Sequence, residues 1–272
     1  MRLIDAHAHL TRGMPFGYLL ARLKEAGVSR AVLMAREVRE ERMMELARRR
    51  PGRIVPMAGG RLFQAALQRG ANRFRVKGVR HYRGFNRTWW QRHGERVFRR
   101  MEEWLRSGDY RGIGEIRLKH RGYGPDVPEM KCNYDFEMSS PIIHRLMGLA
   151  ATYRAPMTVH LEVDTDASAR LRTFSQALKR SPQTPVIWAH GGPCGASVLG
   201  RMLDRHPNLF SEIQPLIRNT YADRVPYLRT FPLQVRGGRL LPAWRRLYER
   251  HADRFLAGSD CRTVAEYRHL TT

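Results

Sequence analysis

The sequence predicts an α/β fold, a (β/α)8 TIM-type barrel, from three observations. Short runs rich in apolar and β-branched residues recur along the chain, and amphipathic helical segments lie between them. The runs are almost continuously apolar, as is typical of parallel strands that are buried on both faces. The length of 272 residues suits a barrel of eight such units. A doubly wound open sheet is the alternative arrangement of the same units.

Eight strands are expected in chain order, and helices are expected between them. The strands span residues 3–8, 30–35, 54–59, 112–116, 157–161, 185–190, 209–213 and 254–258. The helices span residues 18–27, 39–50, 95–108, 140–154, 167–180, 197–206 and 241–253. Several of these segments end in glycine, or in a basic residue followed by proline, as helix C-termini often do. Because no internal repeat or low-complexity linker interrupts the pattern, residues 1–272 are expected to form a single domain.

Three departures from regular alternation predict a distorted barrel. A basic, aromatic segment, residues 61–92, follows the third strand, and residues 118–137 follow the fourth. Both insertions would lie over the C-terminal face of the barrel, where active sites are found, and both are candidate substrate-contact loops. Only twelve residues follow Asp260, so the final helix is expected to be short or missing. Either the sequence is cut short there, or a second subunit covers the gap in a homo-oligomer.

The charge balance is strongly basic, at +24, and arises almost wholly from arginine. Such a field attracts anions, which include nucleic acid, phosphorylated compounds and carboxylated substrates. The basic residues are scattered over most of the chain, however, so a compositional bias toward arginine is the preferred explanation of the charge, with nucleic-acid binding as the alternative. A small anionic substrate is the expected partner, with nucleic acid as the second choice.

The remaining composition indicates the compartment. The three cysteines (Cys132, Cys194 and Cys261) are widely spaced and odd in number, which argues against a disulfide framework and fits a reducing compartment. No apolar run approaches the ~18 residues of a membrane span, and no charged-then-apolar leader precedes the first strand. We therefore expect a cytoplasmic protein with no membrane partner.

The stretch LIDAHAHL places His7 and His9 one residue apart at the end of the first expected strand. Residues i and i+2 of a strand point to the same face, so the two imidazoles would lie side by side. Two buried imidazoles are costly without partners, whereas neutral imidazole is a common metal ligand. Taken alone, the pattern is also compatible with two histidines that have no role in binding.

Four more polar residues fall at the C-terminal ends of other expected strands: Glu115, His160, His190 and Asp260. Strand ends of a parallel barrel converge on one mouth, so all six side chains could meet in space. Each residue alone has a simpler explanation, such as a helix cap at Asp260. Together, four imidazoles and two carboxylates are a suitable ligand set for one or two divalent ions.

These motifs resemble the amidohydrolase superfamily of metal-dependent hydrolases. The matching elements are HAH, GEI, VHLE, AHGG and GSD, in this order along nearly the whole chain. The segments HPNLFSEI and LPAWRRLYERHADRFLAGSD are most similar to the amidohydrolase-2 subgroup of predicted TIM-barrel hydrolases. The glutamate of GIGEI is also similar to one that TatD-type DNases place on this strand. WAHGG and AGSD do not look like the motifs of that second family.

The resemblance implies a role for each residue of the set. His7 and His9 would hold the more buried ion together with Asp260, and His160 and His190 would hold a second ion. Glu115 would bridge the two ions of a binuclear metal centre. The ion would be zinc first, with manganese, iron or cobalt as alternatives, and it would lower the pKa of bound water toward about 7. Asp260 would accept the water proton and pass it to the leaving group. In mononuclear members, the position of His190 polarises the substrate instead.

Further residues near the expected mouth are candidates for substrate contact. Arginine recognises carboxylates and phosphates with two parallel hydrogen bonds. The candidates are Arg36, Arg80, His81, Arg117, Lys119 and Glu162. Glu162 and Glu212, near the ends of the fifth and seventh strands, are candidates either for substrate contact or for supporting the metal ligands. Trp89 and Trp90 are expected to pack the first insertion against the barrel.

The function predicted from these observations is metal-dependent hydrolysis of an amide, lactone or ester bond in a small anionic substrate. Two alternatives remain. The first is a TatD-like metal-dependent DNase or phosphoesterase, which Glu115 and the positive charge favour. The second is a barrel that binds anions without turnover, which the short C-terminal segment favours.

Overall fold

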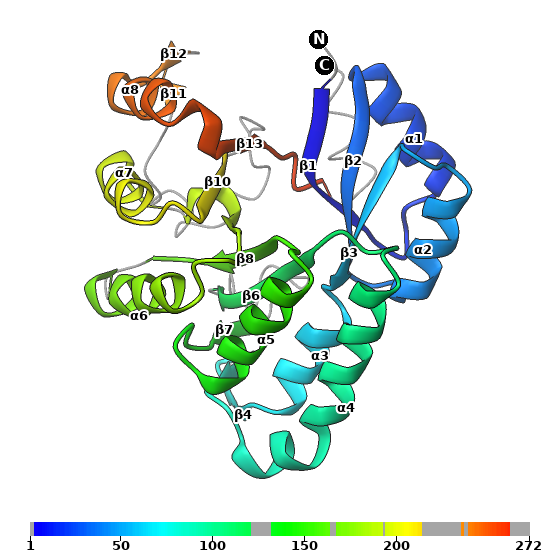
Figure 1. Ribbon diagram of the computed structural model, residues 1–272, viewed down its shortest axis with the longest axis vertical. Coiled ribbons are helices and arrows are strands. Elements are labelled where there is room, and N and C mark those ends of the chain that lie inside the picture. The colour runs from blue at the N-terminus through cyan, green and yellow to red at the C-terminus, as the bar shows by residue number, and fades with distance from the viewer. Residues whose placement is uncertain are drawn as a thin grey trace.

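Eight parallel strands follow one another around a barrel in the computed structural model (Figure 1), which describes residues 3–120, 132–163, 167–192, 194–213, 235–236 and 239–261. The order is β1-β2-β3-β6-β8-β9-β10-β13, and every neighbouring pair along it is parallel. Their bounds are β1 Leu3–Leu10, β2 Val28–Ala35, β3 Ile54–Gly59, β6 Ile113–His120, β8 Met157–Leu161, β9 Val186–Trp188, β10 Leu209–Ile213 and β13 Phe255–Ala257. The eight predicted strands are therefore confirmed, and with them the barrel.

The barrel closes between its first strand and the residues that follow its last. Ala8 and Cys261 form a parallel bridge, the backbone N–H of His9 donates to the carbonyl of Cys261 at 2.9 Å, and the N–H of Asp260 donates to the carbonyl of His7 at 2.8 Å. The buried carboxylate of Asp5 accepts hydrogen bonds from both the N–H and the hydroxyl of Ser259. The two ends of the barrel sequence are thus joined directly beneath His7 and His9.

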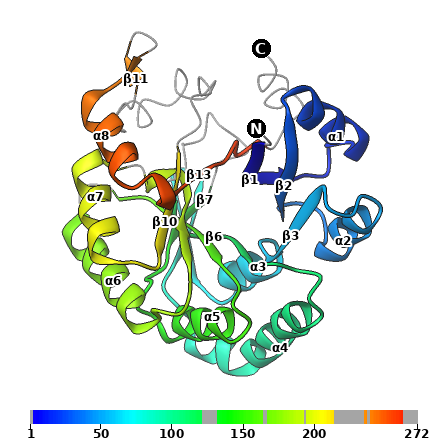
Figure 2. The same ribbon diagram turned by 45° about the horizontal axis from the view of Figure 1, so that its top comes forward.

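Helices surround the strands, as Figure 2 shows. Their bounds are α1 Phe16–Glu25, α2 Glu40–Arg48, α3 Leu62–Arg69, α4 Arg87–Arg106, α5 Pro141–Thr152, α6 Ala167–Arg180, α7 Ala196–Arg205 and α8 Pro242–Arg250, with short 3-10 turns at Ala189–Gly191 and Ala252–Arg254. Local sequence explains where several of them begin. The side chain of Asn86 accepts from the N–H of Trp89 before α4, and Ser140 accepts from Ile143 before α5, in each case satisfying an otherwise unpaired donor of the first turn.

The core lies between the strands and the helices and consists mainly of aliphatic and aromatic side chains. Trp188 on β9 is fully buried, packs edge-on against Phe174 of α6 and donates its indole N–H to the carbonyl of Leu161 at 2.9 Å. None of the helices in the described part of the chain combines the length and the apolar character needed to cross a membrane.

The first insertion is more regular than predicted. It contains α3 and a hairpin of two strands, β4 Asn72–Val76 and β5 Val79–Arg83, before α4 begins at Arg87 rather than at residue 95. The interpretation of residues 61–92 as an interposed loop is therefore wrong, because α3 and β5 bury apolar residues and β4 pairs with β5. Trp90 is buried and donates to the carbonyl of Gly70, so it does pack the insertion against the barrel as predicted.

The second insertion is also partly regular. β6 continues to His120, and β7 Cys132–Asp135 returns antiparallel to it and parallel to β5. Residues 118–120 and 132–135 are therefore strand rather than loop, because this pairing extends the sheet to the hairpin. A further short pair, β11 Val235–Arg236 and β12 Arg239–Leu240, precedes α8. Residues 121–131, and the segment after Cys261 where a short or missing final helix was expected, lie outside the described residues.

Gly114 on β6 and Gly148 on α5 differ in the space around them, so replacing each by alanine tests how tightly β6 is packed. A Cβ added at Gly114 on β6 would lie 2.8 Å from Cβ of Thr158, and Gly114 has a φ of +152°. Gly114→Ala is expected to lower the free energy of unfolding by about 1–3 kcal/mol. Gly148→Ala, where a Cβ on the exposed face of α5 meets nothing, is expected to raise it by about 0.5–1 kcal/mol. Urea denaturation of both variants checks this; equal effects would contradict it.

Candidate metal centre

His7 and His9 extend side by side from β1 and are both buried. Their Nε2 atoms are 2.9 Å apart, and Oδ1 of Asp260 lies 3.1 Å from Nε2 of His9 and 3.7 Å from Nε2 of His7. Ligands bound at 2.0–2.1 Å to a tetrahedral ion lie about 3.3 Å from each other. The three donor atoms are therefore spaced like one face of such a tetrahedron. Nδ1 of His9 is buried and has no hydrogen-bond partner among the described residues.

A second set of donors lies beside the first, at the ends of β6, β8 and β9. Nδ1 of His160 is 3.0 Å from Oε1 of Glu115, and Nε2 of His190 is 3.6 Å from the same oxygen. The other carboxylate oxygen of Glu115, Oε2, lies 3.6 Å from Nε2 of His9. Glu115 thus directs one oxygen toward each set of donors. The structure brings together all six residues that the sequence places at strand ends.

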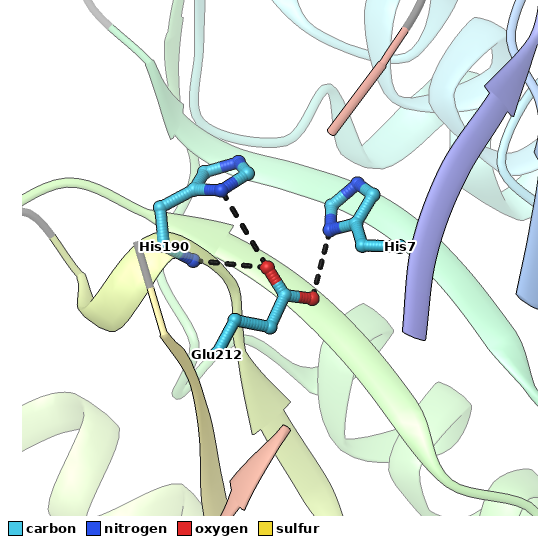
Figure 3. Close-up of side chains that lie close together, drawn as sticks. All are labelled: His7, His190 and Glu212. Atoms are coloured by element: carbon cyan, nitrogen blue, oxygen red, sulfur yellow. Dashed lines mark hydrogen bonds and ion pairs between the residues drawn. The ribbon is translucent and has the colours of Figure 1, made fainter. Parts of the chain in front are cut away.

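Glu212, at the end of β10, lies between two of these histidines (Figure 3). Its Oε1 accepts a hydrogen bond from Nδ1 of His7 at 2.8 Å. Its Oε2 accepts from the backbone N–H of His190 at 3.1 Å and lies 3.5 Å from Nδ1 of that residue. The carboxylate is buried, so it fixes the orientation of both rings and leaves the Nε2 atoms directed into the centre. In the sequence, only the position of Glu212 near the end of an expected strand indicated this orienting role.

A third group of donors continues outward from His160. Its Nε2 is 3.2 Å from Oε1 of Glu162, and its ring centroid is 5.1 Å from that of His120, at the end of β6. All three side chains are buried, and their donor atoms lie within 4.8 Å of each other. His160 therefore has a carboxylate on each ring nitrogen. Of the two roles expected for Glu162, substrate contact and support of the ligands, its position against His160 favours the second.

The backbone holds two of the six residues in an unusual conformation. His190 has a φ of 57° and Asp260 a φ of 50°, and only four non-glycine residues of the described chain have positive φ. A non-glycine residue in this left-handed region costs about 1 kcal/mol or more, and such residues concentrate at functional sites. Both residues lie two or three positions after the end of a strand, and their side chains extend from there into the ligand cluster.

The electrostatics of the centre separate the histidines into two kinds. Burial opposes the charge on His7, but the carboxylates of Glu212, Glu115 and Asp260 outweigh it and raise the pKa of His7 to about 10. His160, also disfavoured by burial but hydrogen-bonded to Glu115 and Glu162, has its pKa raised to about 9. Burial lowers the pKa of His9 to about 4. The pKa of Glu115 falls well below its usual range, because hydrogen bonds from His160 and His190 outweigh the effect of burial.

These shifts predict that metal binding releases protons. At pH 7 the metal-free protein carries a proton on His7 and on His160 that a metal would have to displace, since a ligand must be deprotonated. Affinity should therefore rise as the pH increases, and level off above about 9–10. Isothermal titration calorimetry with Zn²⁺ in buffers of different ionisation enthalpy counts the released protons. We expect between one and two per chain at pH 7; none would contradict the prediction.

The predicted substrate residues are distributed around the centre. Arg117 is half-buried and lies over the ring of Tyr134, with its guanidinium carbon 5.1 Å from the centroid. Arg36 is half-buried at the end of β2, and the charges of Arg117 and Arg36 help burial to lower the pKa of His120 to about 3. Both arginines therefore lie near the third group of donors. Lys119 is 3.6 Å from the carboxylate of Asp135.

Arg80 and His81 do not reach the metal-ligand cluster, because both belong to β5 in the inserted hairpin. The ring of His81 is stacked on that of Phe74, 4.8 Å away, and Arg80 is exposed. The strand pairing of the insertion holds them to the side of the cluster.

A parallel eight-stranded barrel with imidazoles and carboxylates gathered at the C-terminal ends of its strands defines a TIM-barrel protein with a candidate metal centre. A family model described as TatD related DNase matches residues 4–194. The chain belongs to this family. The superfamily predicted from the motifs is confirmed, and the matching family within it is the one whose glutamate the GIGEI motif resembles.

Solved structures show the same fold at low sequence identity. An uncharacterised TIM-barrel protein from Bordetella bronchiseptica is 13% identical, with a TM-score of 0.56 over 100% of this chain and 89% of that one. A 4-oxalomesaconate hydratase from Rhodopseudomonas palustris is 12% identical, with a TM-score of 0.52 over 95% and 81%. A probable 2-pyrone-4,6-dicarboxylic acid hydrolase from Acinetobacter baumannii is 11% identical, with a TM-score of 0.50 over 99% and 91%. No curated protein matches the chain.

Proposed function

We propose that the protein is a hydrolase that uses one or two divalent ions to cleave a bond of an anionic substrate with water. The observation that carries this proposal is the spacing of the donor atoms of His7, His9 and Asp260, with Glu115 directed at both sets of donors. The first set would hold one ion, and Glu115, His160 and His190 would hold a second. The nitrogen and carboxylate donors suit zinc, and also manganese, iron or cobalt.

A divalent ion held by these residues would supply a water activated near neutral pH and would polarise a substrate oxygen. Asp260 accepts a proton from the attacking water and returns it to the leaving group. Its side chain, 21% exposed, is the most accessible of the six. If only one ion is bound, His190, which is oriented by Glu212 and lies 3.8 Å from Asp260, can instead direct the substrate oxygen through its Nε2.

Two classes of bond are candidates. The sequence motifs support a carbonyl substrate, an amide, lactone or ester, as first predicted. The match to TatD related DNases supports a phosphoester. Arg36 and Arg117, next to the centre, suit the negative group of either substrate. A panel of lactones, amides and nitrophenyl phosphodiesters, each tested with Zn²⁺ and with Mn²⁺, separates the two classes.

The experiment that tests the metal centre is elemental analysis of protein purified without chelator, for the wild type and for Glu115→Gln. We expect near two ions per chain in the wild type and one or fewer in the variant, because Glu115 contributes to both sets. About one ion, unchanged by the substitution, would indicate a mononuclear site without Glu115. A wild type that binds no metal, and turns over no substrate of the panel after reconstitution, would overturn the proposal.

A further inference from the structure

The inserted hairpin β4–β5 lies at the surface, and it contains arginine and lysine but no aspartate or glutamate. Nine of residues 61–94 are arginine or lysine, and none is aspartate or glutamate. All five residues of β4 are exposed, including the ring of Phe74, which is 47% exposed. Charged side chains commonly protect exposed edge strands from pairing with other chains, and a surface that carries charges of one sign only also attracts ligands of the opposite sign.

The strand register places this hairpin beside the mouth of the barrel. His120, the last residue of β6, pairs with Tyr134, and Tyr134 pairs with Tyr82 of β5. β5 runs antiparallel to β6, so residues 79–81, which precede Tyr82, extend beyond the end of β6. The turn of the hairpin therefore rises past the rim on which the candidate metal ligands lie. Figure 1 shows β4 and β7 on the same side of the molecule.

The face of the hairpin that carries Tyr82 is connected to the candidate metal ligands by a series of ring contacts. On this face the ring of Tyr82 is stacked on that of Tyr134, 5.5 Å away, and the ring of Tyr134 lies 6.2 Å from that of His120. His120 in turn contacts His160. Because side chains alternate along a strand, Arg80 of β5 and its partner Arg75 of β4 share the face of Tyr82.

Arg75 and Arg80 lie directly opposite each other in the β4–β5 ladder. Like charges at facing positions destabilise a strand pair. Arg73, which faces Tyr82, continues the row on the same side. All three arginines are exposed, and no carboxylate of the described residues lies within ion-pair distance of them. An anion that bridges the facing pair would convert this repulsion into attraction.

We propose that the β4–β5 hairpin binds the phosphate backbone of single-stranded nucleic acid through Arg73, Arg75 and Arg80, next to the mouth of the barrel. The row of three arginines is longer than one small anion. Arg73 and Arg75 are two residues apart on one face, about 6.7 Å, which is comparable to the separation of neighbouring phosphates in an extended nucleotide chain. Phe74, stacked on His81 on the other face of this edge strand, offers a ring on which a base can stack. This inference rests on the phosphoester form of the proposed function.

The test is fluorescence anisotropy of a labelled oligodeoxythymidine at several salt concentrations, in the presence of chelator. Without metal no cleavage can occur, so binding is measured independently of hydrolysis. The variant is Arg75→Gln/Arg80→Gln. The matched control is Arg201→Gln/Arg246→Gln, which removes the same charge from exposed positions on α7 and α8.

We expect the hairpin variant to lose at least about tenfold in affinity at 100 mM salt, and the slope of log affinity against log salt to fall by about 1.4, because each lost single-strand phosphate contact contributes about 0.7. The control should retain nearly full affinity. Thermal unfolding of the hairpin variant should occur no lower than in the wild type, because a repulsive pair is removed.

Equal losses in the two variants would overturn the proposal, since the net charge alone would then explain binding. A wild type that does not bind the oligonucleotide, or that is displaced from it completely by 1–2 equivalents of inorganic phosphate, would also overturn it. The metal analysis of the wild type and Glu115→Gln is independent of this result. Failure of the hairpin proposal therefore leaves the metal centre untouched, and the two experiments show which of the two proposals has failed.

Discussion

Asp260→Asn is expected to lower kcat by about 10²–10⁴-fold, the range that a positioned acid and base contributes to catalysis. The amide has the shape of the carboxylate but cannot accept the proton of water. Asparagine also tolerates positive φ better than most residues, so the φ of 50° at this position should be retained. The measurement is the steady-state rate with the best substrate of the panel, at saturating Zn²⁺ or Mn²⁺.

The matched control for this loss is Asp253→Asn, which changes an exposed carboxylate of the preceding turn. It should leave kcat within about twofold of the wild type, because its side chain does not approach the centre. If Asp260→Asn retained more than a tenth of the wild-type kcat while binding its metals normally, Asp260 would not be the proton acceptor. The role would then pass to another group of the centre.

Glu212→Ala is expected to lower the free energy of unfolding of the metal-free protein by about 3–5 kcal/mol. In the wild type, Glu212 is the principal partner of His7, whose pKa it helps to raise to about 10. Its removal leaves a fully buried ring without its counter-charge and an N–H of His190 without its acceptor. Urea denaturation at pH 7 in the presence of chelator measures the loss.

Glu249→Ala is the control for Glu212→Ala. Glu249 forms an exposed ion pair with Arg245 one turn away on α8, and such pairs contribute at most about 0.5 kcal/mol. The stability contributed by the His7 pair has a defined pH window. It is complete below the unfolded pKa of His7, near 6.5, and is lost as the pH rises toward the folded pKa of about 10. A difference between Glu212→Ala and wild type that grew from pH 7 to pH 10 would contradict this account.

The barrel could be predicted because its signals are local. Each barrel strand is a short apolar run, and the period-two rule was enough to place His7 and His9 on one face. The strand-end positions of Glu115, His160, His190 and Asp260 follow from the same logic, since parallel strands of a closed barrel all end at one rim. The convergence of the six side chains was therefore predictable before any distance was known.

The residues that the sequence did not reveal act through contacts between distant segments. The strand-end position of Glu212 suggested a supporting role, but nothing local indicated that its oxygens contact both His7 and His190. Asp5, within the first strand, gave no indication that it fastens the end of the barrel through Ser259. The β4–β5 hairpin was missed because NRFRVKGVRHYR is dominated by arginine, which obscures the alternation typical of strands. One of its strands, β5, also pairs with β7, which lies 49 residues or more further along the chain.

The closure of the barrel through Asp5 and Ser259 has a consequence for biosynthesis. These residues are 254 positions apart in the chain, and His7 and Asp260 flank the same junction. At about 5–20 residues per second, roughly 13–50 seconds separate the emergence of the first donors from that of the last. A nascent chain thus exposes HAH long before a complete ligand set exists. The proposed ligand set would therefore be complete only when β1 meets the segment that follows β13.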